Sequence, residues 1–391
     1  MSSDEEVIEQ ISVESNTLSD WLNPIKKPLR HKLGILGLIG LAALPAALTP
    51  LQAFQIAGAY FFAMFVMSWD VVSGYTGEIS FGHAMFFAVG GYTSALLNLE
   101  MGLDPLLTIP VGVVAAAVFG AVIGIPALRL RGPYLSLVTL IVPLILAQIF
   151  NVYSNVFGGT QGLVSPPPDR LFGLGTGAPI LTYYVAFGLF VFILAVLLAV
   201  TRSDAGRVFT AIRESEDAVS SAGLNPAKFK VFAFVLSAAI GGLAGAAFVH
   251  TVGEATPAAL LDLFVSIEII IAAILGGMGT IVGAAIGGLF FAIFSGVLGE
   301  ITYQIPVLNA TIAELELVLF AVVTLVLIYA LPGGLLRGGM IVGRYVLDAV
   351  GRGGGGSGGE DVAADGGTRV SPLEQVRDKW ADVLGGDDDE R

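Results

Sequence analysis

TRSDAGRVFTAIRESEDAVSSAGLNPAKFK, residues 201–230, is a charged and helix-prone segment inside an otherwise apolar chain. It lies between two apolar runs, residues 180–200 and 231–252, and lipid does not solvate its charges. Each flanking run is long enough to cross a hydrocarbon layer about 30 Å thick. The segment is therefore expected in water or against another protein, as a loop that joins two membrane helices.

The composition of the whole chain agrees with a membrane location. Its 391 residues are 55% hydrophobic and 13% charged, whereas a soluble domain carries about 25% charged residues. Repeated apolar runs account for the difference, so we expect an all-α fold, a polytopic transmembrane bundle of about ten helices. The predicted apolar segments are residues 33–50, 51–72, 82–99, 107–128, 134–151, 180–200, 231–252, 262–280, 281–299 and 313–331.

The distribution of basic residues tests this number of helices, because cytoplasmic loops are enriched in Lys and Arg. We place the basic cluster at residues 26–32 inside and alternate the sides over ten segments. Fourteen Lys and Arg residues then fall inside and one, Arg170, falls outside. A wrong number of helices would scramble this bias. We therefore expect both termini in the cytoplasm and a multi-pass protein of the plasma membrane.

These boundaries divide the chain into three parts. Residues 1–32 are predicted to be an acidic cytoplasmic segment, and residues 33–335 the transmembrane domain, with residues 201–230 as its large cytoplasmic loop. Residues 336–391 are predicted to be a Gly-rich, acidic cytoplasmic tail with the composition of a flexible linker near its start.

Several kinds of chemistry have no support in the sequence. The chain has no cysteine, and its three histidines are too far apart in sequence to form a metal-ligand motif. No Gly-x-x-x-x-Gly-Lys-Ser/Thr phosphate loop and no nucleophile–base pair is present. We therefore expect no enzyme activity, no catalytic residue, no metal, no cofactor and no nucleic-acid partner.

The stretch GYTGEISFGH, residues 74–83, places three glycines and several polar side chains between two apolar runs. Glycine is unfavourable inside a helix by about 1 kcal/mol, and unwound backbone at membrane depth is tolerated only in protein or along a cavity. Either the stretch is an ordinary cytoplasmic turn or it forms part of a substrate path. The candidate path residues in it are Tyr75, Glu78, Ser80 and His83.

Glu268 is a further candidate path residue, because it lies within the apolar run at residues 262–280. An ionisable residue at mid-membrane costs several kcal/mol unless it is paired or hydrated. The alternative is that the helix begins later and Glu268 lies at its outer end.

The glycine patterns in two regions of the chain favour a structural role. The glycines within residues 238–248 and 276–288 are spaced so that helices can pack closely in lipid. GGTQGLVSPPP, residues 158–168, is predicted on the outer side, where its three consecutive prolines stiffen the loop. That loop either receives an external partner or is a rigid connection only.

Within residues 201–230, the sequence from Arg213 to Gly223 indicates one short helix that ends at glycine, followed by a turn at Asn225-Pro226. Its charges and small side chains suit insertion into a groove of a partner, although a solvated loop explains them as well. The candidate docking residues are Arg213, Glu214, Glu216, Ala218 and Gly223.

Five stretches together, in this order, resemble the permease subunits of branched-chain amino acid ABC importers, the LivM/LivH group. The resemblance covers roughly residues 33–335, and its second stretch and long cytoplasmic loop look more like LivM than LivH. The stretches are GYTGEISFGHAMFFAVGGYTSALL (74–97), RLRGPYLSLVTL (129–140), GGTQGL (158–163), residues 207–246, and SIEIIIAAILGGMGTIVGAAIG (266–287).

The resemblance implies a transport subunit without its own ATPase site. In this family two permease subunits form the pathway, two cytoplasmic ABC ATPases drive it, and an extracellular substrate-binding protein delivers the substrate. Residues 201–230 then resemble the coupling helix that docks on an ATPase. Helix N-termini near residues 74–82 would meet the carboxylate of an amino acid, and Glu78 its ammonium group.

The chain departs from the family pattern at two places. Glu78 follows Gly77 where the family usually has Gly-Gln, and Ser220-Ser221 stand where alanine or acidic residues are frequent. A permease for urea or short-chain amides is an alternative within the family. A secondary transporter that needs no ATPase is an alternative from another class, which would not require the loop at residues 201–230.

Overall fold

The computed structural model describes residues 29–130, 133–163, 177–253, 255–299, 301, 303–305, 310–311, 315–330 and 334–340. Within these residues the fold is all-α, apart from one antiparallel pair of two-residue strands. The elements are α3 (Leu29–Ala43), the short 3-10 helix η1 (Leu44–Ala47), α4 (Pro50–Thr76), α5 (Ala84–Met101), α6 (Pro105–Ala127), α7 (Pro133–Val152), α8 (Ser154–Phe157), η2 (Gly159–Gln161), α9 (Pro179–Arg202), α10 (Asp204–Glu214), α11 (Glu216–Ser221), α12 (Pro226–Val252), α13 (Pro257–Leu261), α14 (Leu263–Gly276), α15 (Ile281–Gly299), β1 (Gln304–Ile305), β2 (Ala310–Thr311) and α16 (Glu316–Ala330).

Every apolar segment predicted from the sequence overlaps one of these helices. Within the described part of the chain, six helices are long and apolar enough to cross a membrane, namely α4, α6, α7, α9, α12 and α15. Helix α14 is shorter, at 14 residues. The all-α fold and the polytopic character are thus confirmed.

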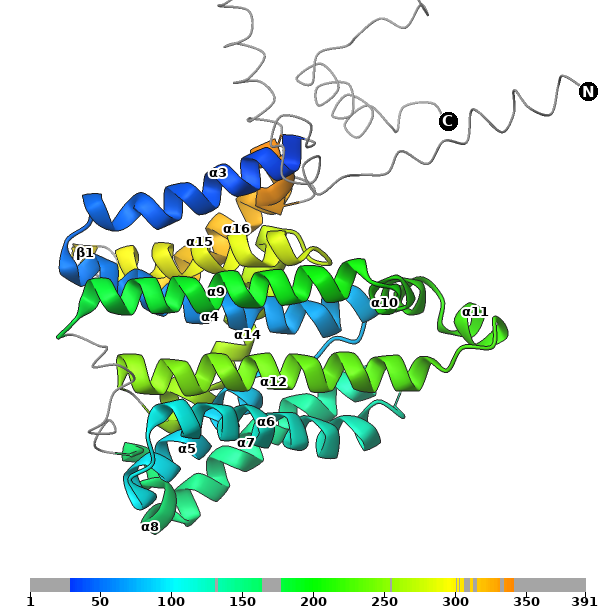
Figure 1. Cartoon of the computed structure of the whole chain (residues 1–391), viewed down its shortest axis with the longest axis horizontal. Coiled ribbons are helices and arrows are strands. Elements are labelled where there is room, and N and C mark those ends of the chain that lie inside the picture. Colours follow the sequence, from blue (N-terminus) through cyan, green and yellow to red (C-terminus); the bar gives the residue numbers. More distant parts are fainter. Residues whose placement is uncertain are drawn as a thin grey trace, which may run out of the picture. The chain divides into compact units, whose positions relative to one another are not determined.

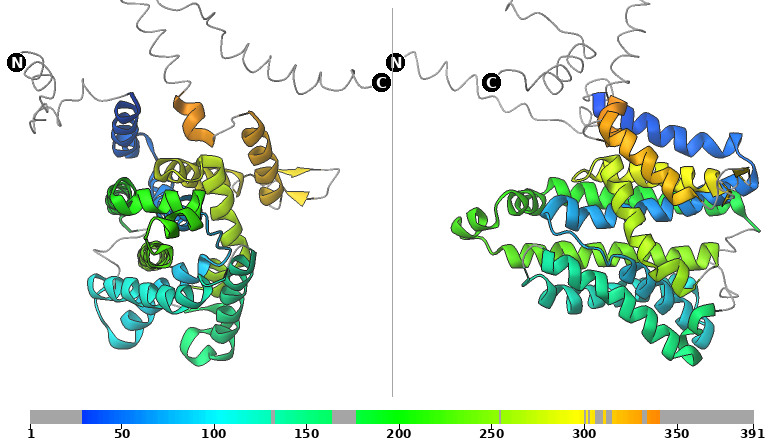
Figure 2. Two further views of the ribbon diagram at one scale, coloured as in Figure 1. Left: turned by 90° about the vertical axis from the view of Figure 1, so that its right-hand side faces the viewer. Right: turned by 180° about the vertical axis from the view of Figure 1, so that it is seen from behind.

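Helix α4 lies among the other long helices and packs against α9, α12, α14 and α15 (Figures 1 and 2). Its side chains are buried on nearly all sides along its second half, which agrees with an apolar surface all round the helix. The hydroxyl groups of Tyr60 on α4 and Tyr183 on α9 are 2.7 Å apart and share a hydrogen bond. A central α4 means that its C-terminal end is surrounded by the segments described below.

Glycines set the closest approaches between helices. A Cβ atom at Gly90 of α5 would lie 2.2 Å from the carbonyl oxygen of Gly242 on α12. A Cβ at Gly287 of α15 would lie 2.0 Å from the carbonyl oxygen of Ala272 on α14. These distances are too short for any side chain, so the close packing predicted for residues 238–248 and 276–288 is confirmed.

Residues 201–230 include two short helices, α10 and α11. The short helix predicted between Arg213 and Gly223 corresponds to α11, and α10 before it was not predicted. Ser215 separates α10 from α11 because its backbone is extended (φ −161°, ψ 106°), and its side chain accepts a hydrogen bond from the Ala218 amide. Gly223 follows α11 with φ +83°, as expected for a glycine that ends a helix. Asn225 then caps α12, whose first residue is Pro226.

The loops fall into two groups at opposite ends of α12. Helices α10 and α11 lie beside the N-terminal end of α12, where α9 also ends (Figure 1). At the C-terminal end of α12, the amide of Leu163 donates a hydrogen bond to the carbonyl oxygen of Ala255. The loops predicted to share a side of the membrane therefore lie together.

Some predictions concern residues outside those that the structure describes. These are the acidic segment before residue 29, most of the tail predicted at residues 336–391, and the three prolines at residues 166–168.

Candidate functional site

The chain turns back along α4 after that helix ends. Gly77 has φ +78° and terminates α4. The hydroxyl of Ser73 donates a hydrogen bond to the carbonyl oxygen of Glu78, 3.0 Å away. The indole nitrogen of Trp69 donates one to the carbonyl oxygen of Ser80, 2.7 Å away. Residues 77–83 are therefore an unwound segment that runs antiparallel to α4 into the bundle.

His83 lies at the inner end of this unwound segment and is fully buried. Its Nε2 is 2.5 Å from the hydroxyl oxygen of Ser237 on α12. The Ser237 hydroxyl donates a hydrogen bond to the carbonyl oxygen of Ser68 on α4. The first amide of α5, that of Ala84, donates to the hydroxyl of Ser266 on α14. Helix α5 thus begins inside the bundle, about two helical turns from the end of α4.

Helix α7 covers the unwound segment from outside. The hydroxyl of Ser136 donates to the carbonyl oxygen of Ile79, 2.8 Å away. The amide of Phe81 donates to the hydroxyl of Thr139, 3.2 Å away. A Cβ atom at Gly82 would lie 1.8 Å from the carbonyl oxygen of Thr139. Polar groups of the segment are therefore paired with protein, which is what unwound backbone at membrane depth requires.

Glu78 forms an ion pair that the sequence did not predict. The ammonium nitrogen of Lys230 lies 2.6 Å from Oε1 of Glu78 and 2.7 Å from Oε2 of Glu216. The Lys230 side chain is 3% exposed, against 15% for Glu78 and 33% for Glu216. Three elements meet at this ammonium group: α12, the unwound segment and α11.

A second polar junction joins α10 to the end of α4. Nη1 of Arg213 donates a hydrogen bond to the carbonyl oxygen of Gly74, 2.7 Å away. Asp70, buried one turn earlier on α4, accepts a hydrogen bond from the Gly279 amide at 2.7 Å. A Cβ atom at Gly279 would lie 2.5 Å from Nη1 of Arg213. The turn between α14 and α15, the end of α4 and α10 are therefore in direct contact.

The residues predicted to dock a partner divide into two sets. Arg213 and Glu216 bind the bundle through the contacts above. Glu214, Ala218 and Gly223 are exposed on the outer side of α10 and α11. A side chain at Gly223 would meet nothing within 4 Å. Since Val219 is buried beneath them, α11 presents a surface of small and acidic side chains to the outside.

The remaining predicted path residues are not all brought together. Tyr75 is half-buried in the last turn of α4 and packs against the main hydrophobic core. Glu268 is half-buried on α14. Its neighbour Ser266, two residues earlier, is the one that contacts the start of α5. The structure therefore places Ser266 at the inner end of the unwound segment.

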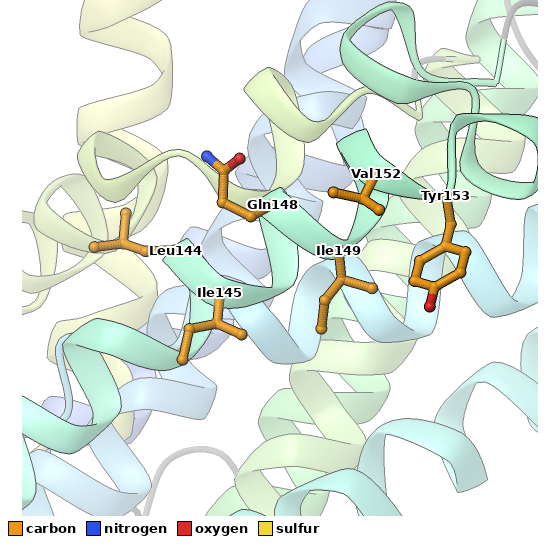
Figure 3. A pocket seen from close by; sticks show the side chains of 6 residues that line it. All are labelled: Leu144, Ile145, Gln148, Ile149, Val152 and Tyr153. Carbon is orange, nitrogen blue, oxygen red and sulfur yellow. The ribbon is translucent and has the colours of Figure 1, made fainter.

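Two surface hollows lie away from the unwound segment. One hollow is near the C-terminal end of α12, between α7 and α13, and is lined by Asn151, Thr160 and Asp262 among others. None of Tyr75, Glu78, Ser80 and His83 lines either hollow. The other is an apolar hollow on the exposed face of α7 (Figure 3), lined by Leu144, Ile145, Gln148, Ile149, Val152 and Tyr153.

Lys230 is the functional candidate that sequence reasoning missed, because it was counted only as one of the cytoplasmic basic residues. One signal was available. Lys230 lies among Phe229, Val231 and Phe232, where an apolar helix begins, and a lone cation there requires a partner. The identity of the partners, from residues 78 and 216, follows only from the fold.

Comparison with known proteins identifies the family of the chain. A family model described as "Branched-chain amino acid transport system / permease component" matches residues 53–331. The high-affinity branched-chain amino acid transport system permease protein LivM of Escherichia coli (strain K12) is 34% identical over 234 residues, which cover 54% of this chain and 55% of that protein. The chain thus spans about half the length of that relative.

Two more distant relatives match over a larger share of their own length. The probable branched-chain amino acid transport permease protein LivM of Methanocaldococcus jannaschii is 25% identical over 277 residues, 64% of this chain and 78% of that protein. The LivH permease protein of Escherichia coli (strain K12) is 26% identical over 247 residues, 59% of this chain and 80% of that protein. No solved structure matches the chain. Because the family model covers more than half of its length, the chain belongs to the family of branched-chain amino acid transport permease components and is a LivM-like, multi-pass membrane permease.

Proposed function

We propose that this protein is the transmembrane permease subunit of an ATP-driven importer for branched-chain amino acids. The observation that carries the proposal is the double connection of α10 and α11 to the bundle, through Arg213 to the end of α4 and through Lys230 to the unwound segment. A permease driven from outside the membrane needs a structural link between its docking surface and its pathway, because coupling requires two states that the driver biases differently.

The partners are those that such a permease requires. A second permease subunit completes the pathway, two cytoplasmic ABC ATPases drive it, one of them docked on the α10–α11 surface of this chain, and an extracellular substrate-binding protein delivers the amino acid. Two exposed small residues, Ala218 on α11 and Gly223 just after it, support a docking surface that admits close contact.

The membrane topology has about ten crossings with both termini in the cytoplasm. The strongest support is the grouping of loops: residues 77–83, the turn at residues 277–280 and helices α10 and α11 are all assigned to the inside by the positive-inside rule, and they contact each other. The loops assigned to the outside, around residues 163 and 255, also contact each other.

The unwound segment is the proposed wall of the substrate path, with Tyr75, Glu78, Ser80 and His83 in or beside it and Glu268 on the neighbouring α14. Its exposed large hydrophobic residue is Ile79, 46% exposed, which offers an apolar wall to an aliphatic side chain. The buried N-terminus of α5 provides a positive end of a helix dipole for the substrate carboxylate.

A pull-down from detergent-solubilised host membranes tests the proposal. The tagged chain should recover two ATPases and a second permease, and the associated binding protein should bind leucine and not urea. In parallel, Gly223→Asp should lose the ATPases, since it adds a charge to the docking surface. Gly102→Asp is the matched control, because Gly102 also has positive φ and open space around it but lies at the far end of α5.

Two results would contradict the importer. Recovery of the chain alone, with unchanged uptake in Gly223→Asp, would mean that α11 docks nothing. A binding protein that takes urea or an amide would retain the ATP-driven permease but change its substrate.

A further inference from the structure

Helix α12 holds both ends of the unwound segment. Lys230 contacts Glu78 at its outer end, and Ser237 contacts His83 at its inner end. Lys230 and Ser237 are seven residues apart on one helix, which places them on the same face, two turns from each other. Both ends of the unwound segment are therefore bound to a single face of α12.

The Lys230 ammonium group lacks a favourable environment apart from its two carboxylates. Its side chain is 3% exposed, so water solvates it poorly. Glu78 and Glu216 both form ion pairs with it, so displacement of either carboxylate removes one of the two partners of a buried charge.

Of the two carboxylates, Glu216 belongs to the element that a partner would move. It is the first residue of α11, whose outer surface is exposed, whereas Glu78 is fixed by the hydrogen bond from Ser73 to its carbonyl oxygen. A displacement of α11 therefore acts on Lys230 first and reaches residues 77–83 through it.

We propose that Lys230 is a positioning residue that transmits movement of α11 to the unwound segment, by sharing its ammonium group between Glu216 and Glu78. This inference rests on the proposed function, because it assumes that an ATPase moves α11. It assigns to Glu78 a role in coupling, through Lys230, in addition to its place beside the path.

The experiment uses the complete transporter, reconstituted in liposomes with its ATPases, second permease and binding protein, and measures leucine uptake and ATP hydrolysis in the same sample. Lys230→Met should lower the number of leucine molecules moved per ATP by about tenfold or more, which is within the usual range of coupling effects. Lys230→Arg, which keeps the charge, should restore most of that ratio. Lys228→Met is the control, because Lys228 is an exposed lysine half a turn away, and it should leave the ratio unchanged.

A triple variant separates coupling from charge balance. Lys230→Met with Glu78→Gln and Glu216→Gln leaves no buried charge unpaired, so the amount of folded complex should return to the level of the unaltered chain. The ratio of leucine to ATP should nevertheless stay low, because the connection from α11 to the segment is absent. A normal ratio in this triple variant, or in Lys230→Met alone, would overturn the inference.

Failure of the proposed function gives a different result. In that case the unaltered chain would show no ATP-dependent leucine uptake. If instead the unaltered chain transports leucine and Lys230→Met reduces uptake and hydrolysis in equal proportion, the importer stands and the role of Lys230 in transmission is wrong.

Discussion

Arg213 donates a hydrogen bond to the carbonyl oxygen of Gly74 over a distance of 2.7 Å and a sequence separation of 139 residues. Gly74 lies in the last turn of α4, where backbone carbonyl groups lack partners within the helix. The guanidinium group supplies such a partner and also fastens α10 to the central helix of the bundle. One side chain therefore caps a carbonyl group at the end of α4 and links that helix to the proposed docking element.

Replacement of Arg213 by methionine should separate docking from transport. We expect ATPases to co-purify as before, since the guanidinium group contacts the bundle, while uptake falls about tenfold because α10 is no longer tied to α4. Arg207→Met is the control, because Arg207 pairs with Asp204 of its own helix and its side chain is 78% exposed. Equal uptake by the two variants would contradict the role given to Arg213.

Gly279→Ala should disturb the same junction from the other side. A methyl group there would lie 2.5 Å from Nη1 of Arg213, and the residue has φ +80°. We expect a loss of about 2–3 kcal/mol in the free energy of unfolding, from backbone strain and the displaced guanidinium group. Gly102→Ala has a positive φ without the close contact and measures the strain alone. Thermal unfolding in detergent should show the larger effect in Gly279→Ala.

Substitutions of two helical glycines should change the stability of the protein in opposite directions. Gly188→Ala on α9 adds a methyl group in open space and should stabilise the protein by up to about 1 kcal/mol, because alanine favours the helix. Gly90→Ala on α5 places its methyl group 2.2 Å from the Gly242 carbonyl oxygen, and overpacking of this kind costs about 1–3 kcal/mol. The midpoints of thermal unfolding should rise and fall accordingly. A higher midpoint for Gly90→Ala would show that α5 and α12 are further apart than described.

The contact between Ser237 and His83 should behave as a paired polar interaction. Ser237→Ala leaves the buried Nε2 of His83 without its hydroxyl partner and should cost about 1–3 kcal/mol. Adding His83→Phe removes the unsatisfied group, so part of this loss should be recovered. Unfolding of the single and double variants, combined as a double-mutant cycle, measures the coupling. Additive losses would mean that the two side chains do not interact.

The sequence by itself determined the class of protein and the position of its helices. Apolar runs separated by charged or Gly-rich stretches are a local property, because each membrane helix must satisfy its own backbone hydrogen bonds. Residues 201–230 could likewise be recognised as a loop from the sequence alone, since their charges are excluded from lipid. Close packing at glycines such as Gly242 and Gly287 was also predictable, because glycine at such spacing has few other uses in a membrane helix.

Only the tertiary structure decided which charges meet. Lys230 is fourteen residues from Glu216 in the sequence and more than a hundred residues from Glu78. Nothing in the local sequence around any of the three residues selects the other two as partners. The split of residues 201–230 at Ser215 and the inward direction of Arg213 also depend on neighbouring helices. Ion pairs and hydrogen bonds between distant segments form where packing brings their ends together, so they follow from the arrangement of helices and not from the sequence of any one helix.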